Sequence, residues 1–259
     1  MLIALTHSVS ESITRCELTF IEREPIDYEL ALRQHAAYCD ALRQGGANVR
    51  ELTDNNEYPD SCFVEDTAVV LDELAVIARM GAESRRGEVD AIERFLAEYR
   101  EIQRIDSPGT LDGGDIIAAG RTIFAGLSPR TNATGIESLA AIVEPRGYEV
   151  CPVAMRDCLH LKSACTPIAP DTLLANPNWV DLSPFGAFRV VTVDKDEPWA
   201  ANALPLGDWV FLASAFERTA EKVESLGFTV RTLDISEYLK AEAGLTCSSI
   251  IFDAGATQV

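Results

Sequence analysis

The chain has 259 residues, 47% of them hydrophobic and 24% charged, and a formal net charge of −19. These values are typical of a soluble globular protein with one large core, and they exclude a nucleic-acid-binding protein, because phosphate binding requires clustered Lys and Arg. No apolar run approaches the ~18 residues of a membrane-spanning helix and no basic leader precedes the first apolar stretch, so we expect a single cytoplasmic domain over residues 1–259 with no membrane partner.

The hydrophobic period predicts a strand at residues 2–5, a helix at 27–46 and a second strand at 48–52. A unit of strand, strand, helix and strand then recurs four times. In its first copy, a hairpin that ends in the run 74–80 precedes an amphipathic helix at 84–99. The strand 101–105 completes this copy. The second copy contains a strand at 121–127, a helix at 130–147 and a strand at 148–154. The third contains strands at 164–169, 172–176 and 188–193, with only a short, poorly helical stretch before the last of them. The fourth contains strands at 202–206 and 209–214, a helix at 216–227 and a strand at 228–233.

One predicted strand, at residues 247–252, is left over at the C-terminal end, and the strand, helix and strand at the N-terminal end lack one partner. Together they complete a fifth unit. A chain whose two ends combine to finish a repeat predicts a closed ring, which also hides the open edges of its sheets. We therefore predict an α/β fold of five ββαβ blades arranged as a propeller. A doubly wound open sheet fits poorly, because paired strands precede every helix.

Charged residues interrupt the strand-like runs at five places, and a buried strand should be apolar. Acidic residues lie at the heads of two strands, where turn formation or capping would also explain them. Arginines lie at two boundaries between hairpin and helix, where they could clamp a carboxylate or only bind a backbone carbonyl or water. The fifth place holds one of only three histidines. These residues are Asp60, Glu65 and Asp66; Asp112 and Asp115; Arg85 and Arg86; Arg130; and His160.

The seven cysteines are odd in number, widely spaced and without a CxxC pair, so we expect free thiols. A zinc site formed by His160 with Cys151, Cys158 and Cys165 is an alternative, but these residues lack the short paired spacing of structural zinc sites. We expect no metal, and no GxGxxG or P-loop motif supports nucleotide chemistry. Cys247, which begins the last predicted strand, is either a buried strand thiol or a nucleophile.

In a closed ring the starts of the five units converge, and the polar residues converge with them. A thiol, a histidine and several carboxylates form a site for a cation with an electrophilic reacting centre, while arginines would anchor a distant carboxylate. A guanidinium amino acid has both features. The alternative from another class is a ring that binds such a ligand without turning it over.

Seven segments of the chain, taken in order, resemble the dimethylarginine dimethylaminohydrolases of the pentein or amidinotransferase superfamily. The resemblance extends from Leu18 to Phe252, and it implies the five-bladed ββαβ propeller of that superfamily and a single catalytic domain. The segments are "FVEDTAVV", "GAESRRGE", "GTLDGGDI", "LSPRTN", "LHLKS", "AAN" at 200–202 and "LTCSS".

Carried over by position, the resemblance implies that Cys247 is the nucleophile, His160 the general acid and base, and Asp112 the carboxylate that orients the histidine. The implied reaction is hydrolysis of free Nω-methylated arginine to citrulline and dimethylamine or methylamine through a covalent S-alkylthiouronium, with no cofactor. Arginine deiminases, arginine dihydrolases and citrullinases are alternatives within the superfamily. The implied partner is a small guanidino amino acid, and the protein would be a monomer or a homodimer active in arginine metabolism and nitric oxide regulation.

The resemblance also implies three groups of substrate-binding residues, which would contact the guanidinium, the carboxylate and the amino group of the substrate. They are Glu65 and Asp66; Arg85 and Arg130; and Asp60 with the backbone carbonyls of Leu18 and Ala241. One departure concerns the last group: the chain has Glu242-Ala243 where the family usually has Asp-Gly. Ala cannot adopt a positive φ as freely as Gly, so we expect this chain to differ from its relatives at this turn.

Overall fold

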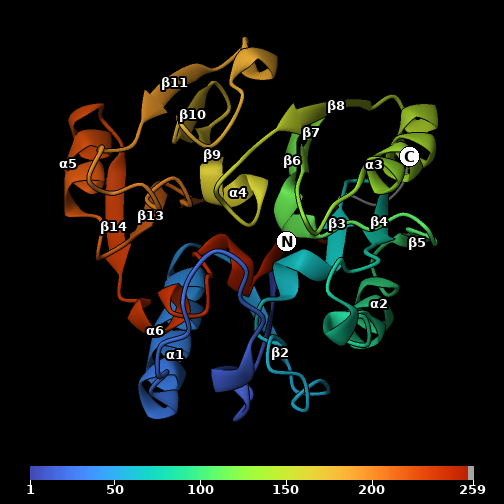
Figure 1. Cartoon of the computed structure of the whole chain (residues 1–259), viewed down its shortest axis with the longest axis horizontal. Coiled ribbons are helices and arrows are strands. Elements are labelled where there is room, and N and C mark those ends of the chain that lie inside the picture. The colour runs from blue at the N-terminus through green and yellow to red at the C-terminus, as the bar shows by residue number, and fades with distance from the viewer. Residues whose placement is uncertain (256–259) are drawn as a thin grey trace.

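The computed structural model describes residues 1–255, and their strands form five separate three-stranded sheets. Figure 1 shows the sheets placed around a common centre. In each sheet the inner and middle strands are antiparallel, while the middle and outer strands are parallel. From inner to outer strand, the sheets are β3 (Ala68–Val70), β4 (Leu74–Ile77) and β5 (Glu101–Arg104); β6 (Ile116–Ala119), β7 (Thr122–Leu127) and β8 (Glu149–Ala154); β9 (Cys165–Ala169), β10 (Thr172–Ala175) and β11 (Arg189–Thr192); β12 (Leu204–Leu206), β13 (Trp209–Ala213) and β14 (Thr229–Leu233); and β15 (Ile250–Asp253), β1 (Leu2–His7) and β2 (Asn48–Leu52).

The fifth sheet joins the two ends of the chain, as the repeat predicts. β15 pairs antiparallel with β1 from Leu2 opposite Asp253 to Leu5 opposite Ile250. The amino group of Met1 also lies 2.7 Å from a carboxylate oxygen of Asp253. β15 therefore takes the inner place in this sheet that β3, β6, β9 and β12 take in the others.

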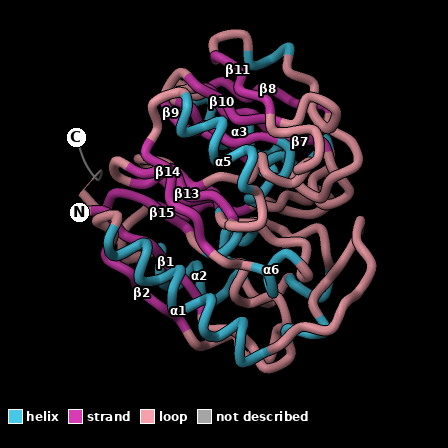
Figure 2. The backbone as a smooth tube through the Cα atoms, turned by 90° about the vertical axis from the view of Figure 1, so that its left-hand side faces the viewer, coloured by secondary structure: helices cyan, strands magenta, loops and turns pink. Residues whose placement is uncertain are grey.

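Helices connect the middle and outer strands of four sheets: α1 (Tyr28–Gln44), α2 (Val89–Leu96), α3 (Ala133–Val143) and α5 (Glu217–Ser225). The sheet β9-β10-β11 has only the 3-10 turn Ser183–Phe185 at this point, in agreement with its poorly helical sequence. α1 begins at Asp27, whose carboxylate accepts a 3.0 Å hydrogen bond from the amide of Leu30. It ends at two glycines, of which Gly46 has a φ of +93°. Figure 2 shows α1 running alongside β1 and β2.

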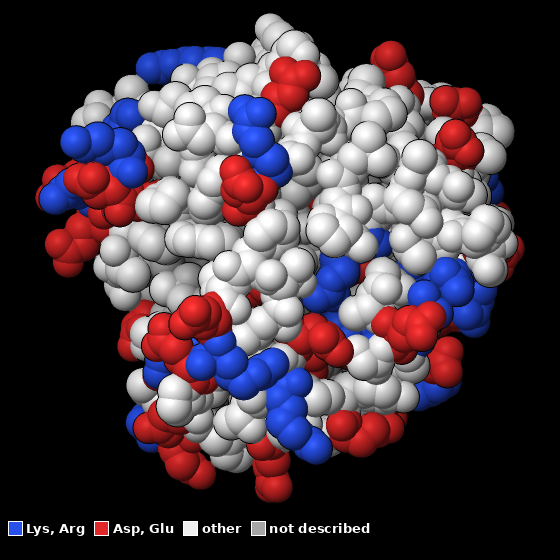
Figure 3. Space-filling model, viewed as in Figure 1, with Lys and Arg blue, Asp and Glu red and all other residues white. Residues whose placement is uncertain are grey.

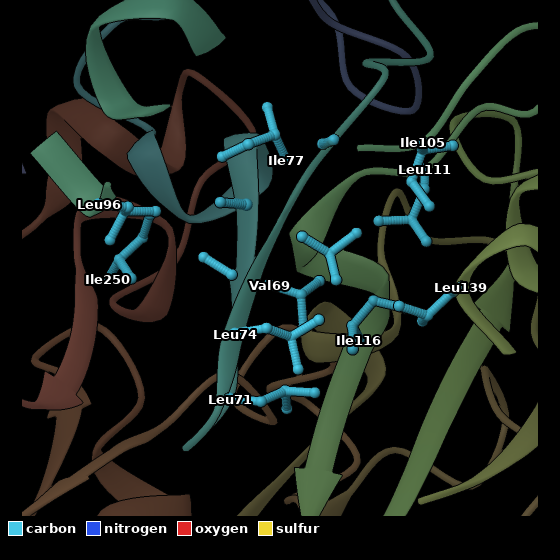
Figure 4. Packing of buried hydrophobic residues seen from close by; sticks show 14 of the residues in the cluster. Val69, Leu71, Leu74, Ile77, Leu96, Ile105, Leu111, Ile116, Leu139 and Ile250 are labelled. Atoms are coloured by element: carbon cyan, nitrogen blue, oxygen red, sulfur yellow. The ribbon is translucent and has the colours of Figure 1, made fainter. Parts of the chain in front are cut away.

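The core lies between neighbouring sheets and beneath the helices. In Figure 4, Val69 and Leu74 of one sheet lie beside Ile116 of the next sheet and Leu139 of α3. Each such side chain contributes roughly 1.5–3 kcal/mol when it is fully buried. Because neighbouring sheets share this core, the positions of their inner strands are fixed relative to one another.

The surface and the helices agree with the composition. Acidic and basic side chains are interspersed on the face shown in Figure 3. Among residues 1–255, none of the helices combines the length and the apolar character that crossing a membrane would require.

The predicted strand at residues 247–252 is wrong at its start. Cys247 lies in the 3-10 turn η7 (Thr246–Ser248), and β15 begins only at Ile250. The turn is held by Tyr38 of α1, whose hydroxyl lies 2.8 Å from the carbonyl of Leu245 and 2.7 Å from the hydroxyl of Ser249. Small polar residues favour such turns because their side chains bond the nearby backbone.

Candidate active site

A polar residue precedes or begins each inner strand, and four of the five lie in or next to short turns. Asp66 lies in η2 (Val64–Thr67) before β3, and Asp112 caps η4 (Gly113–Asp115) before β6. His160 caps α4 (Leu161–Ala164) before β9, Asn202 precedes β12, and Cys247 lies in η7 before β15. η2 packs against η4 and η7, and η4 packs against α4. The predicted convergence of these turns is therefore confirmed.

His160 lies between two carboxylates. Its Nε2 is 3.2 Å from Oδ2 of Asp112, and its Nδ1 is 3.5 Å from Oδ1 of Asp66. All three side chains are buried, with at most 4% of each residue exposed. Burial alone lowers the pKa of His160, but the charge of Asp66, the hydrogen bond to Asp112 and the charge of Asp115 outweigh it and raise this pKa to about 9. At neutral pH the histidine is therefore an imidazolium that can donate a proton.

The glycines of "LDGGD" allow this close approach. A Cβ atom on Gly114 would lie 2.6 Å from Oδ1 of Asp66 and 2.7 Å from Nδ1 of His160. The amide of Gly114 also donates a 3.2 Å hydrogen bond to that oxygen of Asp66. A side chain at position 114 would therefore separate the carboxylate from the histidine.

Arg85 binds Asp66 from the other side. Its Nη1 lies 2.7 Å from Oδ2 of Asp66, and its Nε and Nη2 donate to the carboxylate of Glu88. Nη2 also donates to the carbonyl of Phe63 at 3.0 Å. Burial raises the pKa of Asp66, but the charges of His160 and Arg85 outweigh it and lower this pKa. Arg85 thus keeps Asp66 ionised and oriented, and its predicted contact with the substrate carboxylate stays a prediction.

Arg130 has a different environment. Nη1 of Arg130 is buried without a hydrogen-bond partner, at 3.7 Å from Oδ2 of Asp112, and Nη2 lies 3.4 Å from the hydroxyl of Thr19. Buried donors in native proteins are nearly always paired, so an unpaired guanidinium nitrogen indicates a place for an acceptor. This geometry favours the predicted role of Arg130 in holding a carboxylate.

Asp115 links the histidine to this arginine, a function that sequence reasoning missed. Its Oδ1 accepts a 2.9 Å hydrogen bond from the amide of Leu161, directly after His160. Its Oδ2 accepts a 2.6 Å hydrogen bond from the hydroxyl of Ser128, which itself accepts from the amides of Arg130 and Thr131. The spacing of the two aspartates in "LDGGD" was the available signal: the first contacts the histidine side chain and the second its backbone.

Cys247 is buried, with 9% of the residue exposed. The amide of Gly244 lies 3.3 Å from its sulfur. Burial raises the pKa of this thiol far above its usual value, and the charges of Glu65 and Asp66 raise it further. The resting cysteine is therefore a neutral thiol beside carboxylates, an environment that a cationic ligand would change.

Glu65 lies beside Cys247 but faces a different set of partners. One carboxylate oxygen is 2.7 Å from Nζ of Lys162, and the other accepts a 2.6 Å hydrogen bond from the hydroxyl of Thr246. Asn202 donates to the same hydroxyl and accepts from the amide of Thr246, each at 3.0 Å. Glu65 and Lys162 also line a central cavity of about 410 Å³ between the inner strands. The predicted contact of Glu65 with a guanidinium is not tested by this geometry.

The residues predicted for an amino group lie beside the loop 17–22. Asp60 is buried, and its two oxygens lie 3.2 and 3.1 Å from the amide nitrogen of Glu17. The amides of the next residues after Leu18 donate to the carboxylate of Glu242, which directly follows Ala241. The side chain of Glu242 thus links the segments that contain the predicted carbonyls of Leu18 and Ala241. Glu242 was not among the site residues predicted from the sequence.

One group of ligand atoms within residues 1–255 has a geometry that could hold a metal, with all its atoms within 4.8 Å of one another. It consists of Asp112 and His160, which were predicted for catalysis, and Asp66, which was predicted to bind the guanidinium. The alternative zinc site of His160 with three cysteines is not formed. All seven cysteines are free thiols.

Comparisons with known proteins show which family the chain resembles. A sequence model of the family described as N,N dimethylarginine dimethylhydrolase, eukaryotic, matches residues 13–174. The chain is 36% identical to the N(G),N(G)-dimethylarginine dimethylaminohydrolase of Pseudomonas aeruginosa over 87% of its own length and 90% of the relative. It is 38% identical to the protein of the same name from Streptomyces coelicolor, over 95% of each chain.

Solved structures are similar over nearly the whole chain. A cysteine-to-serine variant of the Pseudomonas aeruginosa enzyme, complexed with citrulline, matches with a TM-score of 0.92 and 34% identity over 96% of this chain and 98% of that chain. A histidine-to-glycine variant of a dimethylarginine dimethylaminohydrolase, as an adduct with S-methyl-L-thiocitrulline, also has a TM-score of 0.92 and 34% identity, over 97% of this chain and 100% of that chain. The N-terminal domain of a cyanobacterial arginine dihydrolase, at 18% identity and a TM-score of 0.83 over 97% of this chain and 98% of that domain, shares the fold.

Proposed function

The chain belongs to the dimethylarginine dimethylaminohydrolase family, and on this premise we propose that it hydrolyses free Nω-methylated arginine to citrulline and dimethylamine or methylamine. The observation that carries the proposal is the side chain of His160, which is buried between Asp112 and Asp66, together with the packing of the Asp66 turn (η2) against the Cys247 turn (η7). A proton donor, an anionic site and a thiol in one place match the requirements of guanidinium hydrolysis.

The first half of the reaction uses the thiol and the imidazolium. A guanidinium beside Asp66 offsets the negative charge that keeps Cys247 protonated, so the thiol gives its proton to a water molecule when the substrate binds. The thiolate attacks the guanidinium carbon and forms the carbon–sulfur bond. His160 gives its proton to the dimethylamino or methylamino nitrogen as the carbon–nitrogen bond breaks, which leaves a covalent S-alkylthiouronium and a neutral histidine.

The second half uses the neutral histidine as a base. His160 takes a proton from water, and the resulting hydroxide attacks the thiouronium carbon. The carbon–sulfur bond breaks, the sulfur leaves as a thiolate, and the remaining hydroxyl proton passes to the released amine. The products are citrulline, a dimethylammonium or methylammonium ion, and the enzyme with Cys247 as a thiolate and His160 as an imidazolium.

The ends of the substrate have separate places in this proposal. Asp66, with Glu65 beside it, receives the guanidinium nitrogens, and Arg130 with Arg85 holds the carboxylate. The unpaired buried Nη1 of Arg130 supports its part. Asp60 and the backbone carbonyls of Leu18 and Ala241 receive the amino group, which is supported by the hydrogen bonds that link the loop 17–22 to Asp60 and to Glu242, the residue after Ala241.

The same proposal includes the closed ring. We infer that the five sheets form a five-bladed propeller closed between the sheet β15-β1-β2 and its neighbours, because β15 contacts β3 and α1 contacts β14. The cytoplasmic location and the state of monomer or homodimer remain predictions.

A panel assay tests the function. Arginine, monomethylarginine, asymmetric dimethylarginine, agmatine and citrulline are each offered, and amine, ammonia and citrulline are measured as products. We expect citrulline with dimethylamine or methylamine in equal amounts from the two methylated substrates. Ammonia from arginine as the dominant product would instead place the chain with the deiminases or dihydrolases, and no product from any compound would contradict a hydrolase.

A further inference from the structure

The loop 17–22 is bound to the rest of the site by one carboxylate that the proposed reaction does not use. Oε2 of Glu242 accepts a 2.7 Å hydrogen bond from the amide of Thr19, and its Oε1 accepts a 3.0 Å hydrogen bond from the amide of Phe20. Only 8% of Glu242 is exposed, whereas Phe20 is 42% exposed. A buried side chain thus binds the backbone of an exposed loop.

The backbone at Glu242 is strained where the side chain makes this contact. Its φ is +58°, and Asp157 is the one other non-glycine residue within 1–255 with a positive φ. Asp adopts this conformation more readily than Glu, so the strain at position 242 requires an explanation. The two charge-assisted hydrogen bonds to the loop provide one, because they depend on the direction in which this backbone sends the side chain.

The contact also controls the two carbonyls proposed to receive the substrate amino group. The amide N–H of Thr19 and the carbonyl of Leu18 belong to one trans peptide group and point in opposite directions, so fixing the N–H fixes the carbonyl. The carbonyl of Ala241 shares its peptide group with the amide of Glu242, which donates to the carbonyl of Leu239 at 3.2 Å. Glu242 therefore holds both peptide groups, the one of Leu18 through its carboxylate and the one of Ala241 through its own amide.

The base of this contact is rigid. Glu242 follows α6 (Ser236–Leu239), which is tied to α1 by Gln34 through the hydroxyl of Ser236 at 2.8 Å and the amide of Glu237 at 3.0 Å. The carboxylate of Glu237 also accepts from the amide of Asp27, just before α1, at 2.8 Å. The loop is thus held against a fixed part of the molecule.

We propose that Glu242 is the positioning residue of the amino-group subsite, which it forms by holding the loop 17–22 so that the carbonyls of Leu18 and Ala241 face one α-ammonium group. The inference rests on the proposed function and adds the residue that makes the enzyme select free α-amino acids. Glu242 does not touch the reacting atoms.

The test compares two substrates in two enzymes. Monomethylarginine and its analogue without the α-amino group are turned over by the wild-type chain and by Glu242→Ala, and the ratio of their kcat/KM values is measured. Losing both charge-assisted hydrogen bonds should lower this ratio about tenfold or more, through KM of the amino acid. An equal loss for the two substrates would overturn the proposal, because a structural defect does not distinguish them.

Two further variants keep the result decisive if Glu242→Ala folds poorly. Glu242→Gln keeps the shape of the side chain and loses its charge and one acceptor, so it should lower the ratio in the same direction. Glu242→Asp keeps the charge and should retain more of the ratio than Glu242→Gln. The matched control is Glu22→Gln, an exposed carboxylate on the same loop, which should leave the ratio unchanged. A loss in Glu22→Gln equal to that in Glu242→Gln would contradict the assignment.

Amide hydrogen exchange gives a readout that does not depend on turnover. The amides of Thr19 and Phe20 should exchange at least about tenfold faster in Glu242→Gln than in the wild-type chain, because their acceptor is weakened. Unchanged exchange would show that Glu242 does not hold the loop. If the wild-type chain makes no citrulline from methylated arginine, the proposed function fails by itself, and the exchange result still decides the role of Glu242 in the loop.

Discussion

The floor of the site and the loop 17–22 are built in different ways. On the floor, His160, Asp112, Asp66 and Arg85 are each at least 96% buried, and every charge has an oppositely charged partner. The loop is held mainly by its backbone, which donates to the carboxylates of Asp60 and Glu242. The difference indicates that the reacting groups are in place before the substrate binds, whereas the contacts with its amino acid end depend on a surface segment. Changes on the floor should therefore act on kcat, and changes at the loop on KM.

The largest effect is expected from the nucleophile. Cys247→Ser should reduce kcat by more than about a thousandfold, because a serine hydroxyl has no comparable ionised form beside two carboxylates. Binding of citrulline, measured by calorimetry, should change little, since the contacts with the loop and Arg130 remain. Release of citrulline by the variant at a rate near that of the wild-type chain would remove Cys247 from the mechanism.

The next effect concerns the stability of the floor against pH. The pKa of His160 is raised from 6.5 to about 9, so its contribution to folding is complete below pH 6.5 and is lost as the pH rises through 9. The free energy of unfolding should therefore fall by ~3 kcal/mol over this interval in the wild-type chain relative to His160→Gln. Urea unfolding of both proteins at several pH values measures the difference. A constant difference would show that the imidazolium is not stabilised by its carboxylates.

The two arginines sharpen the comparison further. Arg130→Lys should raise KM by about tenfold, because an ammonium group cannot replace the planar fork that holds a carboxylate. Arg85→Lys should raise KM as well and should also lower kcat, because Arg85 has a proposed contact with the substrate carboxylate and also orients Asp66. Steady-state kinetics with asymmetric dimethylarginine separate the two parameters. Arg86→Lys is the control, because Arg86 pairs with the exposed carboxylate of Glu83. An unchanged KM in both Arg85→Lys and Arg130→Lys would show that neither arginine holds the substrate carboxylate.

The smallest effect is expected at the loop itself. Thr19→Val removes a hydroxyl that lies 3.4 Å from Nη2 of Arg130, while it keeps the size of the side chain. A hydrogen bond of this length contributes little, so KM should rise about two- to fivefold with kcat unchanged. A fall of kcat without a change of KM would break the division between floor and loop.

The repeat and the convergence of the polar turns were predictable because their signals are local. Apolar runs such as 74–80 mark buried strands, and the polar residues at their heads could be placed at one end of a ring once the two chain ends were seen to share a unit. The exception is Cys247: its predicted strand begins three residues later, because Tyr38 of α1 binds the turn around the cysteine. Nothing within "CSSIIF" indicates that contact.

Pairings between distant residues were not predictable. Lys162 binds Glu65 across 97 positions of the chain, and Asn202 binds Thr246 across 44. Each pairing depends on how two neighbouring sheets pack together, and hydrophobic patterns in a single sequence do not predict this packing. Glu242 is similar: its replacement of the family's usual Asp could be seen in the sequence, but its partners 223 and 222 positions away could not.

The most direct test of the floor is to trap the covalent intermediate. His160 is the proposed base of the second half of the reaction. His160→Gly should therefore still form a carbon–sulfur bond with S-methyl-L-thiocitrulline, whose leaving group needs less help from an acid, but should hydrolyse the product slowly. Mass spectrometry of the acid-quenched protein and of its peptides then locates the adduct. We predict that it lies on the peptide containing Cys247 and is absent in the double variant with Cys247→Ser. An adduct on any other cysteine, or one that persists in the double variant, would contradict the account.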